Sequence, residues 1–369
     1  MRIGLIAPPW VAVPPITYGG TEAVIDNLAR GLVRLGHQVR LFTVSESTCP
    51  VPTDHLFARA ARPIGQTVPE AAHILAAYES LADVDIIHDH TILGPLVGAR
   101  AGRKTPPVVT TNHGPFTATT RPIFARIATS AAVVAISADQ ARRAGDVPIA
   151  TVIHNGIDLD AYRPGAGAAL GPHLVFVGRM SADKGVHRAV RIAHAAGRPL
   201  RIIAKMREPE EKRYYETVVR PLMSAEDEAP EELPFGDRVA VVQSAAALVD
   251  PISWPEPFGL VMAESLAMGT PVIAYPNGAA PEIVTHGRTG FLCPTEFSAA
   301  HAVARLDYID RKACREDAEN RFSLDLMARK YVALYERILD RPVIPPQRRP
   351  SGTMAEWAPI GAAPRGDAA

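Results

Sequence analysis

The sequence lacks any long apolar run, and it contains only three cysteines among its 369 residues. No stretch of about eighteen apolar residues occurs, so no membrane-spanning helix is predicted. The opening residues Met-Arg-Ile-Gly-Leu-Ile-Ala-Pro-Pro favour a short strand that ends at prolines, and not a secretory signal. Cys49, Cys293 and Cys314 lie far apart and have no metal-ligand spacing. We therefore expect a soluble cytoplasmic protein whose cysteines are reduced.

The sequence also lacks net charge, because lysine plus arginine and aspartate plus glutamate both number 39. This balance argues against nucleic acid as a partner. The Walker A loop, the His-Glu-x-x-His zinc motif and the Gly-x-Ser-x-Gly nucleophile elbow are all missing. The trio His88-Asp89-His90 has the composition of a metal cluster, but adjacent side chains on a strand point to opposite faces. No metal site is therefore predicted.

The length of the chain is about twice that of a typical domain, and its hydrophobic fraction of 47% can supply two cores. In the first half, short β-branched segments alternate with helical patterns, which is typical of a parallel sheet with helices on both faces. Residues 21–35 place Val24, Leu28 and Leu32 at helical spacing and predict an amphipathic helix. The strands predicted in this half are 3–7, 38–43, 85–88, 108–111, 132–136 and 151–153.

The same alternation begins again near Leu174, after a turn-rich connection that starts at His154. A helix is predicted after Lys184 and another from Leu260. The strands predicted in this second series are 174–177, 200–204, 246–249 and 271–274. The fold class is therefore α/β, with two Rossmann-like domains that each contain a parallel sheet.

The end of the chain is predicted to contain a final helix followed by a disordered segment. Ser323 is placed to cap a final helix that can pack across the junction between the domains. After Asp340 the composition turns to Pro, Gly, Ala and Arg, and we expect residues 342–369 to be disordered. The predicted division is a first domain over 1–155, joined by the helix at about 323–340 that packs back onto it, and a second domain over 156–322.

The most informative segment is Trp-Pro-Glu-Pro-Phe-Gly-Leu-Val-Met-Ala-Glu, residues 254–264. Pro257 disfavours the helical conformation at Glu256, so this carboxylate is expected in a loop ahead of a helix that begins near Gly259 or Leu260. Glu264 follows about one turn into that helix. The unpaired N–H groups at a helix start favour a phosphate, and two nearby carboxylates can accept hydrogen bonds from sugar and ribose hydroxyls. Pro257, Phe258, Gly259 and Leu260 are therefore predicted to lie at a nucleotide-sugar site.

A second segment, Val-Gly-Arg-Met-Ser-Ala-Asp-Lys-Gly, runs from a predicted strand into a loop that carries Arg179 and Lys184. Breaking a sugar–diphosphate bond leaves negative charge on the departing phosphate. Two fixed cations stabilise that charge more in the transition state than in the ground state. A metal ion is then not required.

Two further positions lie in the first half. Gly19 and Gly20 open the amphipathic helix, and glycine lets the backbone approach a ligand closely. His113 follows the strand 108–111, at the strand end where open α/β sheets bind ligands.

Together these segments resemble the retaining glycosyltransferases of family 4, which have the GT-B fold. The resemblance implies that the parallel sheets of the two domains face each other across a cleft. The resemblance covers roughly residues 1–340. It implies that Glu256 binds hydroxyls of the donor sugar, Glu264 the ribose, and Arg179 with Lys184 the diphosphate. Gly19 and Gly20 resemble the loop that reaches the donor phosphate, and His113 resembles the histidine that touches the donor sugar near the reacting carbon. These roles make His113, Arg179, Lys184 and Glu256 the catalytic candidates.

The expected activity is metal-independent transfer of a hexose, with retention, from a nucleoside-diphosphate sugar to a hydroxyl. The resemblance implies a UDP- or GDP-sugar as donor, no separate cofactor, and a glycan, lipid or small molecule as acceptor. Two alternatives stay open: a catalytically silent nucleotide-sugar-binding protein, and a nucleotide-sugar epimerase or hydrolase of the same fold. The acidic stretch between Met223 and Asp237 favours the silent protein, because the family usually has an apolar strand and a glycine loop there.

Overall fold

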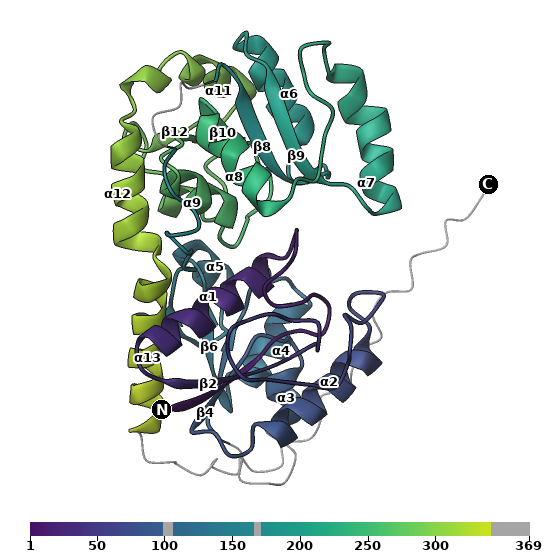
Figure 1. Ribbon diagram of the computed structural model, residues 1–369, viewed down its shortest axis with the longest axis vertical. Helices are drawn as coiled ribbons and strands as arrows, with labels where there is room; N and C mark the ends of the chain where they lie inside the picture. Colours follow the sequence, from purple (N-terminus) through teal and green to yellow (C-terminus); the bar gives the residue numbers. More distant parts are fainter. Residues whose placement is uncertain (99–105, 166–170, 341–369) are drawn as a thin grey trace, which may run out of the picture.

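In the computed structural model, which describes residues 1–98, 106–165 and 171–340, the chain forms two lobes (Figure 1). Each lobe is built on a parallel sheet, with seven strands in the first and five in the second. The predicted fold class is therefore confirmed. Among the described residues, no helix is both long and apolar enough to cross a membrane.

The first sheet has the strand order β3-β2-β1-β4-β5-β6-β7, with β1 and β4 near its centre. Leu5 on β1 lies between Leu41 on β2 and His88 on β4, and all three side chains are fully buried. The strands are β1 (Arg2–Ile6), β2 (Gln38–Thr43), β3 (Thr53–His55), β4 (Ile86–Asp89), β5 (Val108–Thr111), β6 (Ala131–Ala135) and β7 (Ile149–Val152). The helices of this lobe are α1 (Gly20–Arg34), α2 (Thr67–Ser80), α3 (Gly94–Gly98), α4 (Thr120–Ile127) and α5 (Ala138–Arg143).

The second sheet has the order β12-β11-β10-β8-β9. Its strands are β8 (Leu174–Arg179), β9 (Leu200–Lys205), β10 (Ala247–Asp250), β11 (Val272–Ala274) and β12 (Gly290–Leu292). Its helices include α6 (Val186–Ala195), α7 (Pro209–Tyr214), α8 (Phe235–Ser244), α9 (Leu260–Ala267), α10 (Ala280–Ile283), α11 (Glu296–Val303) and α12 (Arg311–Phe322). A π-helical turn (Tyr215–Val219) extends α7, and 3-10 turns cover Arg220–Leu222 and Leu306–Tyr308.

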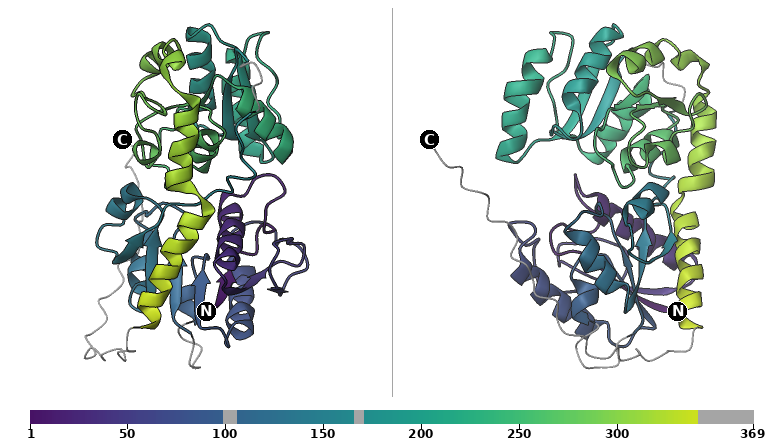
Figure 2. Two further views of the ribbon diagram at one scale, coloured as in Figure 1. Left: turned by 60° about the vertical axis from the view of Figure 1, so that its left-hand side comes forward. Right: turned by 180° about the vertical axis from the view of Figure 1, so that it is seen from behind.

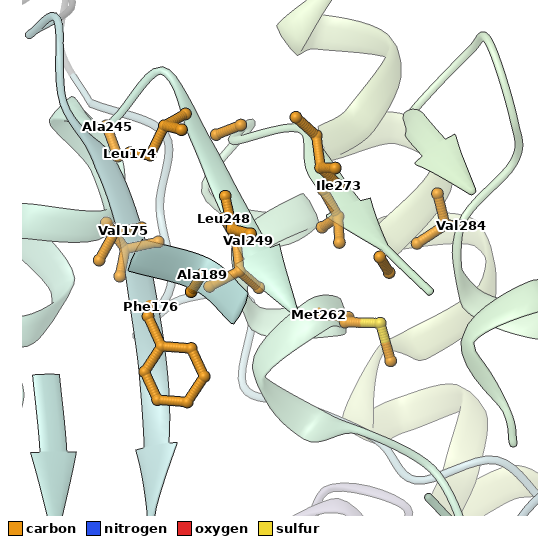
Figure 3. Packing of buried hydrophobic residues seen from close by; sticks show 14 of the residues in the cluster. Leu174, Val175, Phe176, Ala189, Ala245, Leu248, Val249, Met262, Ile273 and Val284 are labelled. Carbon is orange, nitrogen blue, oxygen red and sulfur yellow. The ribbon is translucent and has the colours of Figure 1, made fainter. Parts of the chain in front are cut away.

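Apolar residues from neighbouring strands and helices fill the second core (Figure 3). Phe176 on β8, Leu248 on β10 and Ile273 on β11 are buried, and Met262 on α9 packs into the same cluster. This packing anchors α9 against the sheet, so the start of α9 is held at a fixed place beside the carboxyl ends of the strands.

The acidic stretch forms no strand. A single bridge joins Glu231 to Ile203 at the β9 edge of the sheet, in place of the strand expected there from the resemblance. Three of its acids contact basic side chains: Glu228 pairs with Arg201 and Glu232 with Arg207, and Asp227 lies within hydrogen-bond distance of His194 Nε2, each at 2.7 Å.

The last helix, α13 (Leu324–Leu339), returns to the first lobe. The Ser323 hydroxyl accepts a hydrogen bond from the Leu326 N–H, as the predicted cap requires. Figures 1 and 2 show α12 and α13 as one column along the side of both lobes. Tyr331 and Tyr335 are buried in the core of the first lobe, against α1 and the sheet. The predicted tail, 342–369, lies outside the described residues.

Candidate active site

A cavity of about 1050 Å³ lies between the two lobes, lined by residues of both. The structure brings every candidate of the sequence analysis to it. Those from the first lobe are Gly19, Gly20 and His113; those from the second are Arg179, Lys184, Glu256, Pro257, Phe258, Gly259, Leu260 and Glu264. Residues almost 250 positions apart in the chain therefore share one site.

The helix α9 begins at the cavity as predicted. Its N-cap, Gly259, has φ +92°, a left-handed conformation that side chains rarely adopt. Phe258 is buried against Phe322, with ring centroids 5.9 Å apart, and this contact fixes the entry loop. The Leu260 and Val261 N–H groups have no hydrogen-bond partner among the described residues, and they lie at the positive end of the helix dipole near Glu256.

The start of α1 faces the start of α9. A Cβ atom on Gly20 would lie 3.4 Å from Leu260 Cδ1, so the two helix N-termini are in contact distance. A Cβ atom on Gly19 would lie 2.7 Å from Pro15 Cβ, which leaves room only for glycine. The N-terminus of α1 therefore lies beside that of α9, and a diphosphate bound here would be close to the positive ends of both helix dipoles.

Lys184 and Glu256 form an ion pair at this place. Lys184 Nζ donates to both carboxylate oxygens, at 2.8 and 2.7 Å, and the two side chains are only 12% and 17% exposed. Burial tends to lower the pKa of Lys184, but the charges of Glu256 and Asp250 outweigh it and raise that pKa above its usual range. Burial also raises the pKa of Asp250 to about 7, although Lys184 opposes this shift. The lysine is therefore a cation throughout the physiological range.

Arg179 ends β8 on the same wall. Its guanidinium bonds Asp183 at 3.1 Å, and both side chains are more than a third exposed. A surface pair of this kind contributes little to stability, so Arg179 can exchange Asp183 for a phosphate at small cost.

Glu264 lies one turn into α9 and accepts a hydrogen bond of 2.8 Å from the Tyr162 hydroxyl. Arg238 on α8 donates to the same hydroxyl at 3.4 Å and lies over the Phe235 ring. Tyr162, Arg238 and Phe235 all line the cavity. Sequence reasoning missed these three residues, because no spacing links the interdomain connection and α8 to the α9 acid. The only signal was that Tyr162 lies in the connection and Arg238 directly follows the acidic stretch.

His113 follows β5, and its Nε2 lies 2.9 Å from Nδ1 of His90. Burial lowers the pKa of His113 to about 4. The rings of His88 and His90 lie on one face of the chain, 4.1 Å apart, whereas Asp89 points elsewhere and bonds Thr91 and Tyr78. The sequence analysis did not anticipate that His90 would contact His113.

Two family descriptions match most of the chain. Residues 18–161 match Glycosyltransferase Family 4, and residues 171–321 match Glycosyl transferases group 1. The chain is 31% identical over 159 residues to alpha-maltose-1-phosphate synthase of Mycolicibacterium smegmatis, covering 38% of this chain and 41% of that protein. It is 26% identical over 386 residues to the phosphatidyl-myo-inositol mannosyltransferase of Mycobacterium leprae, covering 92% and 97%. The chain thus spans less than half the length of the first relative, and 49% of a D-inositol 3-phosphate glycosyltransferase of Mycobacteroides abscessus.

Solved structures share the fold over nearly the whole chain. AviGT4, a glycosyltransferase involved in avilamycin A biosynthesis, has a TM-score of 0.72 at 25% identity, covering 92% of this chain and 98% of its own. Sucrose-phosphate synthase from Thermosynechococcus elongatus has a TM-score of 0.78 at 22% identity, covering 92% and 99%. HepE from Anabaena, solved with UDP and glucose, has a TM-score of 0.70 at 20% identity, covering 91% and 99%.

Proposed function

The chain is a GT-B glycosyltransferase of the family 4 type, and we propose that it transfers a hexose from a nucleoside-diphosphate sugar to an acceptor hydroxyl. We further propose that the transfer retains the anomeric configuration and needs no metal ion. The observation that carries the proposal is the meeting of two helix N-termini with Arg179 and Lys184 in one cavity. This is the charge distribution that a leaving diphosphate requires.

The nucleotide donor is also supported by the acids beside this anion site. Glu256 and Glu264 both line the cavity, and in the proposal Glu264 accepts hydrogen bonds from ribose hydroxyls and Glu256 from hydroxyls of the sugar. A related fold, that of HepE, is solved with UDP and glucose, which favours a UDP-sugar, with a GDP-sugar as the alternative. The acceptor, a glycan, a lipid or a small molecule, would bind mainly to the wall of the first lobe.

In the proposed reaction, the bond between the anomeric carbon and the phosphate oxygen breaks as the acceptor oxygen bonds to the same face of that carbon. The acceptor proton passes to the departing phosphate oxygen. Arg179, Lys184 and the free N–H groups of α9 offset the negative charge that grows on the diphosphate. Because an ammonium group has three N–H donors, Lys184 can hold Glu256 and a phosphate oxygen together.

The test incubates the purified protein with UDP-, GDP-, ADP- and TDP-linked glucose, mannose, galactose and N-acetylglucosamine, and with a panel of acceptors. The expected result is a glycoside of the donor's own anomeric configuration, formed equally in EDTA and identified by mass spectrometry and NMR. Inversion, or loss of activity in EDTA, would contradict retention or metal independence. Donor consumption without an acceptor would indicate an epimerase or hydrolase, and donor binding without turnover a silent protein.

A further inference from the structure

The candidate residue His113 has a buried histidine partner. His90 Nδ1 and His113 Nε2 lie 2.9 Å apart, and the rings stack with their centroids at 5.1 Å. His90 is 5% exposed, and its second nitrogen, Nε2, is buried without a hydrogen-bond partner in the part of the chain that the structure describes. His113 lines the cavity, and within the same residues its Nδ1 has no protein partner. One ring is therefore internal and the other reaches the cleft.

Both rings are neutral near pH 7. Burial lowers the pKa of His113 to about 4, and burial, with His88 and His113 close by, lowers the pKa of His90 well below its usual value. A neutral imidazole carries one N–H group and one lone pair. In the contact between the two rings, one nitrogen must therefore donate and the other accept.

The unpartnered nitrogen of His90 decides the direction of this bond. With its proton on Nε2, His90 would bury an N–H group that has no acceptor. Buried N–H groups without a partner are rarer in proteins than acceptors without one. The proton therefore belongs on His90 Nδ1, from which it is donated to Nε2 of His113. Since His113 Nε2 then accepts, its own proton must be on Nδ1.

The structure assigns to His90 the part of a positioning residue, which makes His113 present its Nδ1–H to an oxygen of the donor sugar. This inference rests on the proposed function, in which His113 contacts that sugar. The reverse tautomer would present a lone pair, which cannot donate to a sugar oxygen. Without His90, His113 is free to take the Nε2–H tautomer that neutral histidine favours in water.

The position of the His90 ring is fixed by the ring of His88. The His88 ring lies 4.1 Å from it on the side away from the cleft. His88 is bonded at Nδ1 to the Tyr335 hydroxyl, at 2.7 Å, and at Nε2 to the Thr111 hydroxyl, at 2.8 Å. The two rings packed on His90, those of His88 and His113, are both neutral. No charged ring therefore favours one tautomer of His90 over the other.

The direct test is the tautomer of His113, read from long-range ¹H–¹⁵N correlations of protein labelled at its 12 histidines. The spectrum of His113→Asn identifies the signal by its loss. The wild type is expected to carry the His113 proton on Nδ1. In His90→Phe, which keeps a ring but removes the donor, the proton should move toward Nε2. In His90→Asn, whose amide can donate from the same place, the wild-type tautomer should persist.

Kinetics supply the second readout. His90→Phe should lower kcat/KM for the nucleotide sugar by at least about tenfold, with His90→Asn recovering much of the loss, because a misplaced proton costs catalysis. Binding of the free nucleoside diphosphate, which lacks the transferred sugar, should be unchanged. The control is His73→Phe: His73 is also buried and neutral, but it bonds the Ala7 carbonyl and does not touch His113.

A wild-type proton on Nε2, or a tautomer that does not respond to His90→Phe, would overturn the inference. The NMR result decides this even if His90→Phe fails to fold, because the wild-type spectrum alone has a required outcome. If no nucleotide sugar is turned over at all, the proposed function fails, and the tautomer still reports separately on the role of His90.

Discussion

Lys184 Nζ donates hydrogen bonds to both carboxylate oxygens of Glu256, at 2.8 and 2.7 Å. This ion pair lies where the diphosphate and the donor sugar are expected to bind. The pair is more than four-fifths buried, so each charge depends on the other. Removal of one partner leaves a buried charge uncompensated. The same contact therefore links stability to catalysis.

Glu256→Gln should lower the free energy of unfolding by about 3 kcal/mol and reduce transfer at least a hundredfold, since it removes the counter-charge of Lys184 and a sugar contact. Urea unfolding and initial rates measure the two effects. Glu316→Gln, in an exposed pair with Lys312, is the matched control and should change neither. Full transfer activity in Glu256→Gln would remove Glu256 from the proposed site.

Glu264→Ala should weaken binding of the nucleoside diphosphate about tenfold, because one carboxylate partner of the ribose hydroxyls is lost. Inorganic pyrophosphate, which has no ribose, should bind to the variant and the wild type equally. Isothermal titration measures both ligands. Equal weakening of both would place Glu264 at the phosphates, or show that its loss disturbs α9 as a whole.

Glu22, buried in the first turn of α1 at the cavity, should make the protein less stable as pH rises. Burial raises its pKa from 4.5 to about 7, so between these values the folded state binds the proton that the unfolded state has lost. Stability is then highest below pH 4.5 for this group and declines until about pH 7. Glu22→Gln, which carries no charge, should gain about 2–3 kcal/mol relative to the wild type between pH 5 and 8.

The difference between the two unfolding curves isolates Glu22, because Asp250 and the buried histidines contribute equally to both proteins. Glu316→Gln should instead run parallel to the wild type. A constant gap between Glu22→Gln and the wild type across this range would show that Glu22 is ionised in the folded protein.

Gly31→Ala should destabilise the protein by about 1–3 kcal/mol, because the added Cβ would lie 2.8 Å from Ala328 Cβ and would push α13 away from α1. Gly236→Ala on α8 is the matched control. Its Cβ would meet nothing within 4 Å, and alanine favours a helix by up to about 1 kcal/mol. Urea unfolding should therefore separate the two variants in opposite directions, and equal effects would contradict close packing of α1 on α13.

The elements that could be predicted from the sequence are those with a clear hydrophobic periodicity or a clear terminating residue. The strands β2 and β5 fall at the predicted residues, and α1 and α13 begin within one residue of their predictions. The three-residue strands β3 and β12 were missed, since so short a segment has no measurable alternation. The helix α2 was also missed: its buried residues, His73, Ile74, Ala77 and Tyr78, include a histidine that a hydrophobic pattern does not count.

The candidate site was predictable where its residues lie in continuous segments, such as Glu256 to Glu264. It was not predictable where contact depends on the sheet. His90 meets His113 because β4 and β5 are neighbours in the sheet, and Tyr162 meets Glu264 because the interdomain connection passes α9. No local pattern carries that information.

The return of α13 to the first lobe affects how the protein is made in the cell. Met327, Ala328, Tyr331, Leu334 and Tyr335 complete the same core as Ile3 and Leu5. During synthesis, the first lobe therefore leaves the ribosome with one side of its core uncovered, and this side stays uncovered until α13, which follows the whole second lobe in the chain, has been made. A chain interrupted before Leu324 would carry all the strands of both sheets and still lack one wall of the first core.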